Sequence, residues 1–99
     1  EEIFGPLVTL QTFKSEEDAI EMANDTGFGL SATIWTTSNE KSRRVAKKID
    51  AGVIWINCWM VRDLRTPFGG LKNSGLGREG GKWSLGVYSE ATNICIMDD

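Results

Sequence analysis

The chain has 99 residues, of which 40% are hydrophobic and 25% charged, and its formal net charge is −3. This composition is typical of one small globular domain or of one part of a larger one. The acidic balance and the lack of a long basic run argue against nucleic acid or an acidic membrane surface as a partner, and no apolar run is long enough to span a bilayer.

The cysteines and the lack of histidine limit the chemistry of the chain. Cys58 and Cys95 stand far apart, and small secreted folds usually carry more cysteines than two. No signal-peptide pattern begins the chain, so free thiols in the cytoplasm are expected. Without histidine, a Cys–His nucleophile and most transition-metal sites are excluded from this sequence, and we expect no metal.

The first third of the chain predicts a strand, a helix and a second strand. Residues 7–13 are rich in β-forming side chains and predict the first strand. Ser15 precedes three acidic residues, a pattern that favours the start of a helix, and Gly27 favours its end. Residues 30–36 predict the second strand.

A second helix and a third strand follow with short connections. Thr37 or Ser38 caps a helix that is expected over residues 39–50. Gly52 ends this helix, and the apolar residues 53–56 predict a strand that is buried on both faces. Alternating strands and helices of this kind predict an α/β fold with a parallel βαβαβ segment.

After residue 70 the chain becomes rich in glycine and polar side chains. A short helix is expected over residues 81–88 and a final strand over residues 92–97. That last strand has no obvious partner within the sequence. Because an unpaired apolar strand is prone to associate, we expect it to meet another chain or another part of a larger protein.

The loop at residues 57–70 follows the third strand and is the most informative part of the sequence. It carries tryptophan, methionine, aspartate and two arginines, Arg62 and Arg65, and it closes on Pro-Phe-Gly-Gly. α/β proteins place ligand contacts in loops at the ends of buried strands. Arginines beside aromatic side chains therefore predict a pocket for a flat or anionic small molecule.

Three motifs resemble the C-terminal part of an NAD(P)-dependent aldehyde dehydrogenase. They are Glu-Glu-Ile-Phe-Gly-Pro at residues 1–6, the loop at 57–70, and Lys-Asn-Ser-Gly-Leu-Gly-Arg-Glu at 72–79. The resemblance runs in order from residue 1 to about residue 97. The loop segment Trp-Met-Val-Arg-Asp-Leu-Arg is similar to the branch that oxidises 2-hydroxymuconic or 2-aminomuconic semialdehyde, and the sequence does not separate these two substrates.

The resemblance implies a division of the chain and an oligomer. Residues 1–75 would be the last part of the catalytic α/β domain, and residues 76–99 would be a loop, a short helix and a C-terminal oligomerisation strand. In the family this strand joins a small sheet that meets the neighbouring subunit, so we expect a homo-oligomer of undetermined number. The chain starts without methionine and inside a motif, and we therefore expect a fragment of a longer protein.

Glu2 and Phe4 are the candidate cofactor contacts. A carboxylate accepts hydrogen bonds from ribose hydroxyls, and an aromatic ring packs against a nicotinamide face. From the residues alone, an exposed acidic end and a core phenylalanine are the favoured interpretation, and the resemblance reverses this preference. The resemblance implies that Glu2 contacts the nicotinamide ribose and that Phe4 lies near the ring, with NAD expected over NADP from the family branch.

Arg62 is the candidate anchor for the carboxylate of an anionic aldehyde substrate. A guanidinium binds a carboxylate through two parallel hydrogen bonds, and a muconic semialdehyde is a planar anion. Arg65 is the alternative anchor, but it lies closer to the Pro-Phe-Gly-Gly turn and could pair with Asp63 or with a partner chain instead.

Three further residues of the loop are candidate substrate-binding residues. Trp59 and Phe68 are expected as apolar walls of the pocket, a role that depends on the resemblance because lone aromatic side chains are usually core. Asn57, at the end of the third strand, is expected to hold the loop backbone through its amide.

Two tempting sites are set aside. Residues 75–80 match GxGxxG letter for letter, but a polar loop precedes them rather than a strand, so a tight structural loop is expected. Cys58 has no histidine to activate it and follows a buried strand, which favours a packed thiol. The resemblance places the catalytic cysteine and the general-base glutamate upstream of residue 1, so no catalytic residue is assigned here.

The sequence therefore predicts one part of an NAD-dependent aldehyde dehydrogenase that converts a semialdehyde to its carboxylic acid. The 99 residues alone are predicted to be inactive. Two alternatives remain: a non-catalytic truncated module that self-associates, and a small nucleotide-binding protein that uses residues 75–80.

Overall fold

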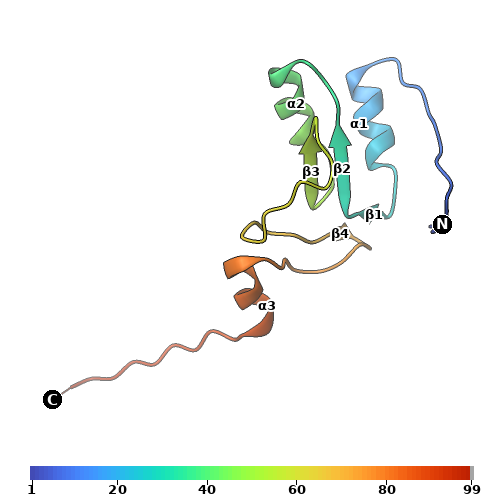
Figure 1. Cartoon of the computed structure of the whole chain (residues 1–99). Coiled ribbons are helices and arrows are strands. Elements are labelled where there is room, and N and C mark those ends of the chain that lie inside the picture. The colour runs from blue at the N-terminus through green and yellow to red at the C-terminus, as the bar shows by residue number, and fades with distance from the viewer. Residues whose placement is uncertain (99) are drawn as a thin grey trace.

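A parallel two-stranded sheet lies at the centre of the computed structural model, which describes residues 1–98. Strands β2 (Ser31–Ile34) and β3 (Val53–Ile56) pair in parallel along their whole length. Helix α2 (Asn39–Ala46) connects them, and α1 (Glu16–Asn24) precedes β2 (Figure 1). The α/β character is confirmed in this β2–α2–β3 unit.

Helix α1 begins where its capping residue predicts. The Ser15 hydroxyl accepts a hydrogen bond from the Asp18 N–H at 3.1 Å, and the Lys14 N–H donates to the Asp18 carboxylate at 3.0 Å. Two of the donors at this helix start are therefore satisfied by side chains.

Helix α2 is capped by Ser38, whose hydroxyl accepts a hydrogen bond from the Lys41 N–H at 3.2 Å. It ends at Ala46, so the predicted continuation to residue 50 is wrong. The Asn24 side chain donates to the Lys48 carbonyl at 2.7 Å and accepts from the Asp50 N–H at 2.9 Å. Because these groups bond to α1, they are not available to extend α2.

A second, antiparallel pair lies beside the parallel sheet. It consists of β1 (Phe28–Gly29) and β4 (Leu71–Lys72). The predicted short C-terminal helix is confirmed as the 3₁₀ turn η1 (Gly81–Ser84) followed by α3 (Leu85–Tyr88).

The strands predicted at residues 7–13 and 92–97 are not formed. Both segments run extended and exposed without regular secondary structure, and the C-terminal one projects away from the sheet (Figure 1). A strand is defined by its hydrogen-bonded neighbour, and within residues 1–98 neither segment has one. The predicted βαβαβ segment is thus reduced to one βαβ unit, and the division at residue 75 stays a prediction.

The described residues bury little apolar surface. Trp55 in β3 is the one large apolar side chain of residues 1–98 that is buried, and 8% of it remains exposed. The radius of gyration is 18.4 Å, whereas a compact domain of this length has about 13 Å. Much of the apolar surface in this chain is therefore available for contact with further protein. None of the helices in the described range is long and apolar enough to cross a bilayer.

Candidate functional site

The loop of residues 57–68, here called the arginine loop, is fastened to the sheet at its start. The indole N–H of Trp55 donates to the Val61 carbonyl at 2.8 Å. The Asn57 side chain accepts from the Thr36 N–H and donates to the Thr36 carbonyl, both at 2.8 Å. The amide of Asn57 thus joins the ends of β2 and β3, and direct contact of Asn57 with a substrate stays a prediction.

Two residues of the arginine loop have left-handed backbone conformations. The φ angles of Asn57 and Met60 are 53° and 59°. Left-handed backbone at a residue other than glycine costs of order 1 to 3 kcal/mol and persists only where the surroundings impose it. The hydrogen bonds of Trp55 and Asn57 are contacts that impose it here.

The structure brings Arg62 and Phe68 together. The guanidinium carbon of Arg62 lies 4.2 Å from the centre of the Phe68 ring, a cation–π contact. An Nη2 hydrogen of Arg62 is donated to the Glu79 carboxylate at 2.8 Å. The Arg62 side chain is 42% exposed, so its guanidinium is held in place and still accessible to an anion.

Glu79 is the residue of this cluster that sequence reasoning missed. Its backbone forms an isolated β-bridge with Phe68, in which each N–H donates to the other's carbonyl at 2.8 Å. Glu79 belongs to one of the motifs quoted above, but nothing in a sequence shows which residue a short bridge places opposite Phe68. The bridge delivers a carboxylate to Arg62 from a segment 17 residues further on.

Arg65 pairs with Asp63, which is one of the roles that the sequence allowed for it. Its Nε donates to both Asp63 carboxylate oxygens, at 2.9 and 3.1 Å. The guanidinium of Arg65, helped by its backbone N–H, holds the pKa of the Asp63 carboxyl below its usual range. Both arginines pair with a carboxylate, but Arg65 is 87% exposed whereas Arg62 is also stacked on Phe68, and this second contact favours Arg62 as the anion-binding residue.

Trp59, Glu2 and Phe4 lie in the open. Trp59 is 70% exposed and Phe4 is 92% exposed, with a φ of 50° at Phe4. Glu2 lines a shallow hollow of about 780 Å³ that is bordered by residues around β1 and β2. No hydrogen bond or ion pair within residues 1–98 joins Glu2 or Phe4 to Arg62, and their predicted roles stay predictions.

The side chain of Arg78 holds the glycine-rich loop at residues 75–80 in place. The Arg78 guanidinium donates to the carbonyls of Gly70 and Gly77, at 3.0 and 2.6 Å. A side chain at Gly80, where φ is 106°, would meet the Thr66 carbonyl. These contacts fasten the loop to the end of the arginine loop and favour a structural role over a phosphate cradle.

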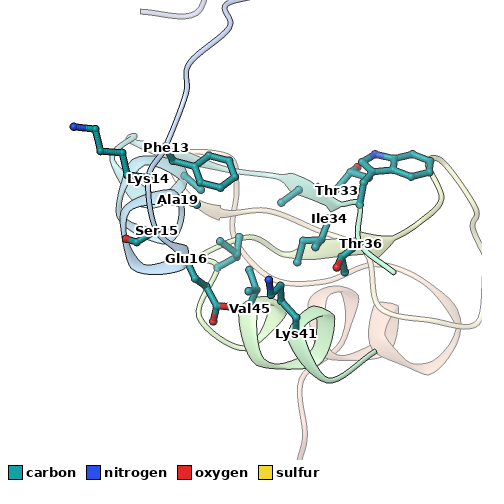
Figure 2. A pocket seen from close by; sticks show the side chains of 14 residues that line it. Phe13, Lys14, Ser15, Glu16, Ala19, Thr33, Ile34, Thr36, Lys41 and Val45 are labelled. Atoms are coloured by element: carbon teal, nitrogen blue, oxygen red, sulfur yellow. The ribbon is translucent and has the colours of Figure 1, made fainter. Parts of the chain in front are cut away.

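The hollow between α1, β2 and α2 is the other cavity considered. It has a volume of about 620 Å³, and Ala19, Ile34 and Val45 give it an apolar lining (Figure 2). Glu16 and Lys41 stand at its border, and Phe13 covers part of it (Figure 2). Because it lacks convergent polar groups on its floor, we interpret it as incompletely covered core.

Within the described part of the chain, no three metal-ligating side chains come together. Cys58 is partly buried and Cys95 exposed, and neither forms a disulfide. The arrangement at the arginine loop is suited to binding and orienting an anion.

The arginine loop follows the carboxyl end of β3, and α/β proteins commonly bind their ligands at this edge of a parallel sheet. The aldehyde dehydrogenase family profile matches residues 1–94. The chain therefore belongs to the aldehyde dehydrogenase family.

The most informative relatives act on muconic semialdehydes. The chain is 53% identical over 96 residues to 2-hydroxymuconic semialdehyde dehydrogenase from Pseudomonas sp. (strain CF600), covering 97% of this chain and 20% of that protein. It is 54% identical over 99 residues to 2-aminomuconic 6-semialdehyde dehydrogenase from Pseudomonas sp., covering 100% of this chain and 20% of that protein.

The fold agrees with that of a solved aldehyde dehydrogenase from Bacillus cereus, determined as its NAD⁺ complex. The TM-score is 0.86 at 46% identity, with 91% of this chain and 18% of that chain covered. The chain thus spans about a fifth of the length of the proteins it matches.

Proposed function

We propose that this chain is part of an NAD-dependent aldehyde dehydrogenase that oxidises a semialdehyde of the 2-hydroxymuconic or 2-aminomuconic type to the carboxylic acid. The observation that carries the proposal is the accessible guanidinium of Arg62, held between Phe68 and Glu79. The two relatives named above support it through the substrates in their names.

Arg62 binds the carboxylate at the far end of the aldehyde. One Nη2 hydrogen bonds to Glu79, which leaves further N–H donors of the guanidinium for a second carboxylate. A bidentate, charge-assisted pair fixes the direction of the substrate as well as its affinity. Phe68 and Trp59 provide flat apolar surface beside the conjugated chain of the substrate.

Glu2 and Phe4 are our proposed contacts to NAD. Their chemistry fits the cofactor. The exposed Glu2 carboxylate can accept hydrogen bonds from ribose hydroxyls, and the exposed Phe4 ring can pack against the nicotinamide. NAD, when bound, supplies the oxidising equivalent. This chain's own contribution is to hold the ribose, the ring and the substrate carboxylate, and we assign it no nucleophile or general base.

Two wider assignments complete the proposal. We propose a homo-oligomer formed through residues 92–97, because Ile94, Ile96 and Met97 are exposed on an extended segment. We also propose a cytoplasmic location, because the free thiols of Cys58 and Cys95 are typical of a reducing compartment.

The test compares Arg62→Ala with Arg65→Ala in the full-length protein, with NAD reduction as the readout. A hydrogen-bonded charged group contributes about 1.5 to 3 kcal/mol, so Arg62→Ala should raise the KM for 2-hydroxymuconic semialdehyde by roughly 10-fold to 100-fold. Arg65→Ala should change it less than about threefold, because Arg65 already pairs with Asp63. Equal effects of the two variants would contradict the assignment of Arg62.

A further inference from the structure

We infer that Trp55 is a positioning residue for Arg62, acting through the backbone of the arginine loop. Its indole N–H donates to the carbonyl of Val61, the residue directly before Arg62, at 2.8 Å. This inference rests on the proposed role of Arg62 as the substrate anchor, and it concerns how that anchor is held.

Trp55 is suited to this role by its place in the fold. It lies in β3, paired with Thr33 of β2, and it is the best-buried large apolar side chain of residues 1–98. A buried indole ring has few alternative positions, so its N–H is a fixed donor. The hydrogen bond to Val61 therefore fixes the position of the loop relative to the sheet.

The loop needs such a restraint because its backbone is strained. Asn57 and Met60, both in left-handed conformations, lie between Trp55 and Arg62. Asparagine adopts this conformation readily, so the strain lies at Met60, which without an external hydrogen bond would relax to more common backbone angles. The Trp55 N–H closes the strained segment at Val61, just after Met60.

The residue after Arg62 is held as well. The Asp63 carbonyl accepts hydrogen bonds from the Thr66 N–H at 3.0 Å and from the Thr66 hydroxyl at 2.7 Å. The carbonyls on both sides of Arg62 are thus fixed, one by Trp55 and the other by a local turn. Of these two restraints, only the one from Trp55 connects the loop to the parallel sheet.

Without the indole N–H of Trp55, we expect Arg62 to be less well positioned and to bind the anionic substrate more weakly, while the rate of the chemical step is unchanged. The hydrogen bond of Trp55 goes to the backbone of Val61 and not to the side chain of Arg62, so its removal acts on the pre-organisation of the guanidinium. Ordering a flexible side chain on binding costs conformational entropy and therefore weakens binding. The KM for the anionic substrate should therefore rise by about fivefold, while kcat stays within about twofold of the wild-type value.

The experiment uses full-length Trp55→Phe, with Trp35→Phe as the matched control. Trp35 follows β2 and is largely exposed. Each variant is assayed by NAD reduction with 2-hydroxymuconic semialdehyde and with an uncharged aldehyde of similar length. We expect Trp55→Phe to raise the KM for the anion alone and Trp35→Phe to change neither KM.

A double-mutant cycle distinguishes a positioning effect of Trp55 on Arg62 from a general loss of structure in the variant. If Trp55 acts through Arg62, Trp55→Phe should add no further increase in KM in an Arg62→Ala background. A rise in KM for both aldehydes, or a further rise without Arg62, would overturn the inference. So would an unchanged KM in Trp55→Phe when Arg62→Ala raises it. An Arg62→Ala variant with unchanged KM would instead overturn the proposed function.

A second variant removes the donor without changing the shape of the side chain. Replacing Trp55 by 3-benzothienylalanine exchanges the indole N–H for sulfur and keeps the bicyclic ring. This variant should reproduce the selective rise in KM even if Trp55→Phe fails to fold. A benzothienyl variant with a wild-type KM for the anionic substrate would overturn the inference.

Discussion

At the scale of single residues, Arg62 and Arg65 have identical side chains but different contacts, and we therefore expect different roles for them. They stand three positions apart on one loop, yet Arg65 pairs with Asp63 and is 87% exposed, while Arg62 is stacked on Phe68 and paired with Glu79. The sequence predicted that an arginine of this loop binds an anion and that Arg65 could pair locally. It could not predict the cluster at Glu79, because that contact depends on a bridge between distant segments.

Asn57 offers a test of how the arginine loop is fastened. Asn57→Ala removes both hydrogen bonds to Thr36 and places alanine in a left-handed conformation. At about 1 kcal/mol per hydrogen bond, plus about 1 kcal/mol for the backbone, the expected loss of stability is about 3 kcal/mol. Thermal unfolding of the full-length protein measures it.

The matched control is Asn93→Ala in the exposed C-terminal segment. Its effect should stay within about 0.5 kcal/mol, as is usual for exposed side chains. If both variants unfold at the wild-type temperature, the clamp between Asn57 and Thr36 does not hold the loop.

At the scale of elements, helices α1 and α2 are linked by one ion pair. Arg44 donates two hydrogen bonds to the Glu16 carboxylate, both at 2.8 Å. The hydrogen bonds from Arg44, followed by its charge, lower the pKa of Glu16. A carboxyl with a lowered folded-state pKa stabilises the fold above its ordinary value and loses that contribution as the pH falls through the folded-state pKa.

The stability difference between wild type and Glu16→Gln should therefore depend on pH. We expect the wild type to be more stable at pH 7 and the difference to shrink once the pH falls below the ordinary value of 4.5. Thermal unfolding at pH 7 and pH 3 measures this, with Glu17→Gln in the same helical turn as the control. A difference of equal size at both pH values would contradict a role for the ionised pair.

Among the elements, those with local signals were the predictable ones. The Ser15 cap places α1, and the apolar residues of β3 place that strand, because both signals lie within a few residues. The length of α2 was overestimated because Asn24, far away in sequence, takes the groups that would extend it. The strands expected at 7–13 and 92–97 need partners that residues 1–98 do not provide.

At the scale of the whole molecule, the exposed apolar residues near the C-terminus predict association. Ile94 and Ile96 alternate with Cys95, so a strand in this segment would place both isoleucines on one face. Ile96→Asp in the full-length protein should lower the oligomeric mass measured by light scattering, because a charge at a buried strand interface is costly. Asn93→Asp is the control, and an unchanged mass in Ile96→Asp would contradict the proposed interface.

The most direct test of the account is the preference of the full-length wild-type protein for an anionic aldehyde. NAD reduction is followed with 2-hydroxymuconic semialdehyde and with an uncharged aldehyde of similar length. If Arg62 anchors the substrate carboxylate, kcat/KM should favour the anion by at least about tenfold. Equal kcat/KM values for the two aldehydes, or no NAD reduction with either, would contradict it.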